Sequence, residues 1–242
     1  MELKICHLYS DVMNLSCDRG NLICMEKRLQ WRGIDVEIVP VNMGDTLSAD
    51  AFDLIFIGNG QPFAQPLLLE DLRQNKADAL CAAVEADVPV LAIDGGYELL
   101  GKTYETADGQ KLEGLGILDV ETKCGQKRLV GNCAFNCEEL NTIVVGFENH
   151  AGHVTLGEGV KPLGKILSGG GNNGTDGTEG ARYRNVFASY AHGSLLPKNP
   201  VLCDHILKLA LERKYGEVEL APLDDAIEIA AHDYMVQRLT AK

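Results

Sequence analysis

The stretch at residues 88–101, which reads V-P-V-L-A-I-D-G-G-Y-E-L-L-G, constrains this chain more than any other. A short apolar, β-rich run ends at Asp94, two glycines follow, and a helical pattern begins at Tyr97. A strand that turns sharply into a helix is the local form of a nucleophile elbow. The turn lifts one side chain above a sheet, and glycines let neighbouring backbone pass close by. We therefore expect an α/β protein with a site built around Asp94.

The first half of the chain alternates between strand and helix patterns. Strands are predicted at residues 3–9, 34–39, 53–57 and 88–93, and helices at residues 20–31 and 66–86. Asp18 is expected to cap the first helix, and Gly33 is expected to end it in the left-handed conformation. This order is typical of a parallel sheet with helices on both faces.

The second half has a different pattern. Short strands are predicted at residues 115–120, 128–133, 142–147, 154–156 and 185–190, which indicates a β-rich layer. Helices are expected at residues 201–214 and 224–239. The glycine-rich residues 169–180 lack the lysine of a phosphate-binding loop, so a surface loop is favoured. No long linker divides the chain, and we expect one domain over residues 1–242.

Charge and hydropathy narrow the choice of partners and compartment. The formal net charge is −13, which argues against nucleic acid and anionic membrane surfaces as partners. No apolar run is long enough to span a membrane, and Met1 leads straight into a strand-like segment rather than a signal peptide. We expect a cytoplasmic protein without membrane insertion.

Eight cysteines allow disulfides, a metal site or plain core thiols. Cys124, Cys133 and Cys137 lie fairly close in sequence, but the chain has no C-x-x-C pair, so zinc is disfavoured. Disulfides are not expected in the cytoplasm. We predict no metal and no cofactor.

Three predicted strands end in residues suited to catalysis. These ends are the glycine-rich turn with Gly58, Gly60 and Gln61, the elbow with Asp94 and Gly95, and His192. In open α/β sheets ligand sites form at the carboxyl ends of strands, so we expect these ends to meet. Backbone N–H groups of the glycines can stabilise an oxyanion, and a histidine can act as general base for the elbow residue.

Longer motifs link the chain to a known family. It resembles the class I (triad) glutamine amidotransferases, and more closely their cobyric-acid-synthase-like branch, which includes GatD-type glutaminase subunits. The resemblance rests on the elbow and on D-R-G-N at residues 18–21, G-N-G-Q at 58–61, E-G-L-G-I-L-D at 113–119, G-F-E-N-H at 146–150, T-E-G-A-R-Y-R-N-V at 178–186 and H-G-S-L-L-P-K-N-P at 192–200.

The resemblance implies a three-layer α/β fold and a glutaminase reaction. In the family a cysteine at the elbow attacks the side-chain amide of glutamine and releases ammonia. The histidine matching His192 is its base, and the arginine matching Arg128 helps to bind glutamine. The implied partner is a Mur-ligase-like (MurT-type) subunit that uses ATP to amidate the D-glutamate of the peptidoglycan stem peptide in lipid II.

The chain departs from the family at the nucleophile itself. Asp94 stands where the family has cysteine, and Glu98 stands where a glutamine is usual. A carboxylate is a weak nucleophile toward an amide, and two acids in one pocket repel the α-carboxylate of glutamine. His192 is also not followed by an acid two residues later, and the resemblance implies that the partner supplies it. We therefore expect glutamine hydrolysis to be lost or altered.

Two alternatives stay open for position 94. The chain is a non-catalytic pseudo-glutaminase that scaffolds or regulates its ligase partner, or Asp94 replaces a working cysteine. The change at Glu98 and the altered residues 62–65 weigh against a single deliberate substitution.

Six further residues have structural or functional interpretations. His150 is assigned to a structural turn rather than a metal site, and residues 148–149 are expected to hold loop backbone. His7 and Tyr9 either line the pocket or pack at the sheet end. Arg128 is a glutamine ligand or a solvated surface residue.

Overall fold

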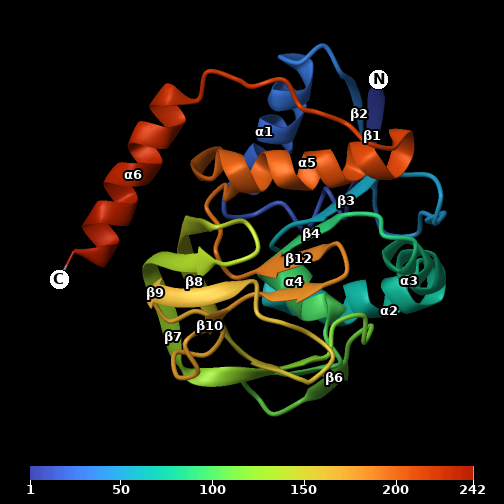
Figure 1. Cartoon of the computed structure of the whole chain (residues 1–242). Helices are drawn as coiled ribbons and strands as arrows, with labels where there is room; N and C mark the ends of the chain where they lie inside the picture. Colours follow the sequence, from blue (N-terminus) through green and yellow to red (C-terminus); the bar gives the residue numbers. More distant parts are fainter. Residues whose placement is uncertain (242) are drawn as a thin grey trace.

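The computed structural model describes residues 1–241 and contains a mostly parallel sheet (Figure 1). Its strands run in the order β11-β12-β4-β3-β1-β2, and neighbouring strands are parallel except for the β11 and β12 pair. The bounds are β1 Glu2–Leu8, β2 Asp35–Val41, β3 Leu54–Ile57, β4 Val90–Ile93, β11 Ala181–Tyr183 and β12 Val186–Ser189. The predicted parallel sheet is confirmed, and the predicted strand ends lie within about two residues of these bounds.

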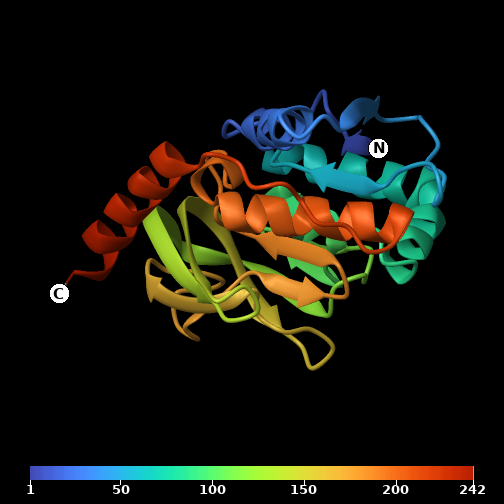
Figure 2. The same cartoon turned by 45° about the horizontal axis from the view of Figure 1, so that its top comes forward.

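Helices cover both faces of this sheet, as the two views in Figures 1 and 2 show. Helices α1 (Arg19–Gln30) and α5 (Pro200–Tyr215) lie on one face, where Phe56 packs in a cluster with Met25 and Ile206. Helices α2 (Gln65–Asn75), α3 (Ala77–Glu85) and α4 (Gly95–Leu100) lie on the other. Successive strand residues point to opposite faces, so an apolar run such as β3 supplies both cores.

A second sheet carries the β-rich half of the chain. Its order is β10-β9-β7-β5-β6, and β8 pairs with β7. The bounds are β5 Thr103–Glu105, β6 Lys111–Glu113, β7 Val120–Cys137, β8 Thr142–Leu156, β9 Gly164–Ser168 and β10 Thr178–Glu179. The short strands predicted at 128–133, 142–147 and 154–156 are parts of the long β7 and β8. The register of this pair shifts between Cys124 and Leu129.

The single helix predicted at residues 66–86 is two helices in the structure. Lys76 separates α2 from α3, and its backbone leaves the helical region with φ −139°. Its ammonium is buried and pairs with Asp71, which also accepts a hydrogen bond of 2.6 Å from the hydroxyl of Tyr9. The break in the helix directs the Lys76 side chain into the protein. The periodic spacing of apolar residues, on which the prediction of one helix rested, does not indicate such a break.

The prediction of a strand at residues 115–120 was wrong. Backbone N–H groups of Leu115 and Leu118 donate to carbonyls at the end of α4, at 3.1 and 2.9 Å. Gly116 adopts φ +69°, which interrupts an extended conformation. The segment is therefore a loop between β6 and β7 that packs against the end of α4, and β7 begins only at Val120.

The last helix, α6 (Ala226–Thr240), stands at the edge of the second sheet (Figure 2). It has no fully buried residue, and the side chains of Ile227 and Tyr234 are 82% and 64% exposed. Two short 3-10 turns, η1 (Pro62–Ala64) and η2 (Leu196–Lys198), complete the described elements. No helix in residues 1–241 is long and apolar enough to cross a membrane.

Candidate functional site

The predicted elbow is present at the junction of β4 and α4. Asp94 lies between the two elements with φ 49° and ψ −109°, a conformation that a residue with a side chain rarely adopts. A Cβ on Gly96 would approach the carbonyl oxygen of Ile57 to 2.6 Å. The glycine is therefore required, because α4 starts against the end of β3.

His192 is brought to the elbow from the far end of the chain. It follows β12 and forms an isolated bridge with Phe147, whose N–H and carbonyl are 3.3 and 2.8 Å from their partners on His192. Its Nε2 lies 3.9 Å from Oδ2 of Asp94. Burial, together with the smaller effects of the positive charges of Lys198 and Arg128, lowers the pKa of His192 to about 4. The imidazole is therefore neutral near pH 7.

The glycine-rich turn after β3 lies beside the elbow. The backbone N–H of Gly95 points at the side-chain oxygen of Asn59, at 3.4 Å, and a Cβ on Gly95 would lie 3.5 Å from the backbone nitrogen of Gly60. The N–H of Gly96 donates to the carbonyl of Gly58 at 3.1 Å. The turn and the elbow thus meet as predicted, while Gln61 is exposed just before η1.

Asp18 was expected to cap α1, but its side chain makes no capping hydrogen bond to this helix. Its Oδ2 instead accepts a hydrogen bond of 2.6 Å from the backbone N–H of Asn59. The carboxyl is fully buried, and burial raises its pKa to about 7. Asp18 therefore positions the glycine-rich turn next to Asp94.

Glu98 is buried one helical turn after the elbow. Its carboxylate accepts hydrogen bonds from the Gln65 side chain at 2.6 Å and from the Tyr190 hydroxyl at 2.9 Å. A Cβ on Gly152 would lie 2.1 Å from Oε1 of Glu98, so a glycine is needed there. Burial raises the pKa of Glu98 to about 7. Gln65 belongs to the altered residues 62–65, and its contact with Glu98 gives that change a structural reason.

Carboxyl groups dominate the electrostatics at the elbow. Burial, followed by the charges of Glu98 and Asp18, raises the pKa of Asp94 well above its usual value. Glu179 adds to this effect, and Arg128 opposes it. Glu179 also accepts hydrogen bonds from the Ser189 hydroxyl and the Tyr190 N–H, at 2.7 and 2.8 Å, which fixes the chain just before His192.

Arg128 is an exposed residue of β7, and its positive charge acts to lower the pKa values of Asp94 and Glu98. Its guanidinium donates to the side-chain oxygen and the carbonyl of Asn149, at 2.6 and 2.8 Å. Glu148 accepts hydrogen bonds from the backbone of Gly170 and Gly171, as expected for a residue that holds a loop. Arg128 is thus held in place by β8.

His150 was assigned to a turn, and this assignment was wrong. It lies within β8, stacked on the ring of Tyr190 with centroids 3.6 Å apart. Its Nδ1 lies 2.7 Å from the carbonyl oxygen of Gly152. In residues 1–241, no group of three or more histidine, cysteine or acidic side chains is placed to hold a metal ion.

Several members of the site were not identified from the sequence. Glu179, Tyr190 and Gln65 act through buried hydrogen bonds between distant segments, and no local pattern marks them. Glu179 does fall within the T-E-G-A-R-Y motif, which offered an indirect signal.

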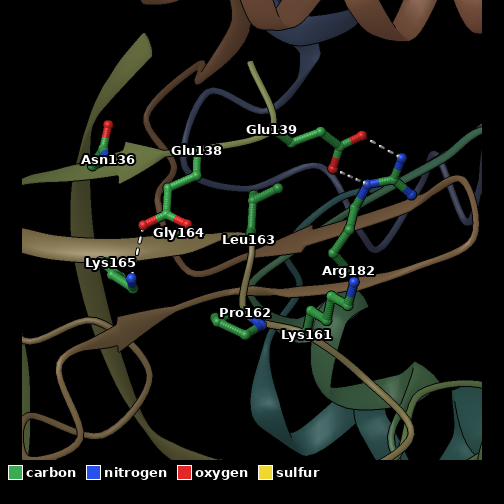
Figure 3. Close-up of a pocket in the computed structure, with 9 residues that line it drawn as sticks. All are labelled: Asn136, Glu138, Glu139, Lys161, Pro162, Leu163, Gly164, Lys165 and Arg182. Carbon is green, nitrogen blue, oxygen red and sulfur yellow. Dashed lines mark hydrogen bonds and ion pairs between the residues drawn. The ribbon is translucent and has the colours of Figure 1, made fainter. Parts of the chain in front are cut away.

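A separate cavity of about 430 Å³ lies where β7, β9 and β11 meet (Figure 3). Arg182 pairs with Glu139, and Lys165 pairs with Glu138, at 3.0 and 2.7 Å. The residues that line it do not include Asp94 or His192. This cavity is therefore distinct from the site at the elbow.

The sequence of the chain is similar to those of glutamine amidotransferase domains. The family described as "CobB/CobQ-like glutamine amidotransferase domain" matches residues 4–200. The chain is 40% identical over 237 residues to the lipid II isoglutaminyl synthase subunit GatD of Staphylococcus aureus (strain N315), covering 98% of this chain and 96% of the relative. For the subunit of that name from Streptococcus pneumoniae (strain ATCC BAA-255 / R6), the identity is 35%, with 93% and 87% covered.

More distant proteins share parts of the sequence or the fold. A probable cobyric acid synthase of Methanothermobacter thermautotrophicus is 32% identical over 220 residues, which cover 85% of this chain and 42% of that protein. A crystal structure of a glutamine amidotransferase superposes with a TM-score of 0.58 at 18% identity, covering 85% of this chain and 98% of its own. The glutaminase domain of Trypanosoma brucei CTPS with bound acivicin gives 0.55 at 13% identity, with 90% and 96% covered. These structures confirm the predicted fold.

Proposed function

The chain belongs to the family of CobB/CobQ-like glutamine amidotransferase domains, and on this premise we propose that it is the amidotransferase-type subunit of a lipid II isoglutaminyl synthase. The support is the nearly full-length similarity to two relatives of that name. The proposed product is the amidated D-glutamate of the peptidoglycan stem peptide. The proposed partner is an ATP-using, Mur-ligase-like (MurT-type) subunit, with which the chain forms a cytoplasmic heterodimer.

One observation supports our proposal for what this subunit contributes: Asp94 occupies the apex of the elbow, 3.9 Å from His192. Attack by its carboxylate on glutamine would have to expel ammonia and leave a mixed anhydride, which is more reactive than the amide it came from. A thiolate forms a thioester in the same step and is a far better nucleophile near neutral pH. Glutamine hydrolysis is therefore lost, and amidation uses ammonia that does not come from glutamine.

A second candidate is a subunit that scaffolds or regulates the ligase without any chemistry of its own. The hydrogen bonds around Glu98 favour it, because both carboxylate oxygens already have partners in Gln65 and Tyr190. Buried acids at positions 94 and 98 also repel the α-carboxylate of glutamine. On this alternative the elbow is a structural feature of the family that carries out no reaction in this chain.

The test is to reconstitute the chain with its ligase and to measure two rates. Ammonia release from glutamine and amidation of lipid II are followed with glutamine or ammonium chloride as nitrogen source. We expect no ammonia release by the natural chain and faster ammonium-dependent amidation when the chain is added. Ammonia release from glutamine by the natural chain would contradict the loss of hydrolysis. Failure to bind the ligase would refute the proposed function.

Two variants sharpen this test. Asp94→Cys restores the family's nucleophile, so glutaminase activity in that variant would show that the glutamine pocket survives. Cys17→Ser is the matched control. Cys17 is an exposed cysteine whose carbonyl accepts a hydrogen bond of 2.6 Å from Ser194, close to His192. Any ammonia release that disappears in Cys17→Ser would identify that thiol as a replacement nucleophile.

A further inference from the structure

Two cysteines on neighbouring helices lie against each other in the outer layer of the fold. Cys24 is in the middle of α1 and Cys203 is in the first turn of α5, 179 residues later, and their sulfur atoms are 3.8 Å apart. The two helices pack together on the same face of the parallel sheet (Figure 1). A disulfide bond is about 2.05 Å long, so the sulfurs need to approach by less than about 2 Å to form one.

The two thiols differ in their access to solvent. Cys24 is half-buried and lines a cavity of about 300 Å³. Apolar side chains form much of its wall, among them Ile23, Trp31 and Leu196. Cys203 is fully buried and does not line this cavity. A small oxidant can therefore reach the Cys24 side chain, whereas Cys203 is shielded from it.

The surroundings of Cys24 favour its thiolate form. The hydrogen bond with Cys203 lowers the pKa of Cys24, and the positive charge of Arg28 also lowers it. Burial and the charges of Asp204 and Asp225 oppose this shift without cancelling it. Burial raises the pKa of Cys203 well above its usual value. Cys24 is therefore the nucleophile of the pair, and Cys203 is the thiol that reacts second.

We propose that Cys24 and Cys203 form a reversible disulfide that locks α1 to α5 when the protein meets a peroxide. Both cysteines are free in this structure, and disulfides that form in a reducing compartment are usually transient and redox-sensing. The bond would close a loop of about 180 residues, which strongly restricts the unfolded chain. It would add a covalent link beside the ion pair of Arg28 with Asp204, which already joins the same two helices.

The oxidation consumes one hydrogen peroxide for each disulfide. The Cys24 thiolate attacks one oxygen, an S–O bond forms, the O–O bond breaks, and the leaving hydroxide takes up the proton that the Cys24 thiol had released. Cys24 is then a sulfenic acid, oxidised by two electrons, and one water has formed. The Cys203 sulfur loses its proton and attacks the Cys24 sulfur. The S–S bond forms, the S–O bond breaks, and hydroxide leaves with that proton as a second water. A small thiol reverses the bond by exchange.

The experiment treats the full, reduced chain with hydrogen peroxide and maps its thiols by mass spectrometry. Trypsin places Cys24 in peptide 20–27 and Cys203 in peptide 199–208, and neither peptide contains another cysteine. We expect the two peptides to be joined in the absence of reductant and separate after treatment with dithiothreitol. Urea unfolding of the oxidised chain should have a higher midpoint than that of the reduced chain.

Single variants separate the roles of the two thiols. In Cys203→Ser the sulfenic acid of Cys24 has no thiol to react with and should be trapped by dimedone, whereas in Cys24→Ser the buried Cys203 should stay unmodified. Cys81→Ser is the matched control and should still form the linked peptides. Cys81 is also half-buried, but burial and the charges of Asp78 and Glu85 raise its pKa. In the natural chain it should therefore oxidise at least about tenfold more slowly than Cys24.

Three results would overturn the proposal. The first is that peptides 20–27 and 199–208 stay separate in the folded, oxidised chain. The second is that Cys81 is oxidised as fast as Cys24, which would show that the surroundings of Cys24 do not activate its thiol. The third is a linked pair that lowers the urea midpoint, because the bond would then strain the contact between α1 and α5 instead of locking it. The measurements need neither ligase nor glutamine, so they are independent of the proposed function.

Discussion

Replacing Glu98 by glutamine should stabilise the protein in a way that depends on pH. The pKa of Glu98 is raised from 4.5 to about 7 in the folded protein because the carboxyl is buried. Between these two values the folded state binds more protons than the unfolded state, so the free energy of unfolding falls as pH rises. A glutamine side chain does not titrate, so the substitution removes this loss of stability. The gain in the free energy of unfolding is therefore small at low pH and complete above about pH 7.

The structure sets the expected magnitude. The interval from 4.5 to about 7 corresponds to roughly 3 kcal/mol at most, of which about 2 kcal/mol should develop between about pH 5 and pH 8. The hydrogen bonds can be kept, because the Tyr190 hydroxyl can still donate to the new amide oxygen. The Gln65 amide can turn its oxygen toward the new NH₂ group.

Urea unfolding of the natural chain and of Glu98→Gln at several pH values measures this effect. Glu113→Gln serves as control, since the Glu113 carboxylate is 84% exposed and its replacement should show no such pH dependence. In a thermal scan above pH 7 the variant should melt several degrees higher, at roughly 2–4 °C per kcal/mol for a chain of this size. A stability difference that is the same at pH 5 and pH 8 would refute the reasoning.

Three further changes test other parts of the fold. Lys76→Met removes the buried cation that pairs with Asp71 and should lower the free energy of unfolding by about 3 kcal/mol. Urea unfolding measures this change, and an unchanged urea midpoint would show that the ion pair is dispensable. Gly96→Ala places a Cβ 2.6 Å from the carbonyl oxygen of Ile57 and should cost about 2 kcal/mol or more, which a higher melting temperature would contradict. Asp94→Gly relieves the positive φ at the elbow and removes a buried acid, so stability near pH 7 should rise by about 1 kcal/mol; a loss of stability would show that the carboxyl supports the fold.

Local patterns were enough to predict the parallel sheet and the centre of the site. The apolar runs that became β3 and β4 each end in polar or glycine-rich residues. Because parallel strands share one carboxyl edge, Asp94 and the turn at Gly58 had to meet there. His192 could be added because it follows another strand.

The surroundings of the site depend on contacts that no local pattern encodes. Glu98 receives its hydrogen bonds from Gln65 and Tyr190, which come from segments distant in sequence. Asp18 has the position of a helix cap, yet its carboxyl is used by the Asn59 backbone. At Asp18 a tertiary hydrogen bond thus replaced the local one that sequence rules assume.

The backbone at Asp94 also limits how a cysteine could arise at this position by mutation. No single base change converts an aspartate codon into a cysteine codon, and the shortest routes pass through glycine or tyrosine. A tyrosine ring does not fit at a buried position where the carboxylate already lies 3.9 Å from His192. Glycine accepts φ 49° without a Cβ clash. The geometry of the elbow therefore leaves glycine as the intermediate that the fold tolerates between aspartate and cysteine at position 94.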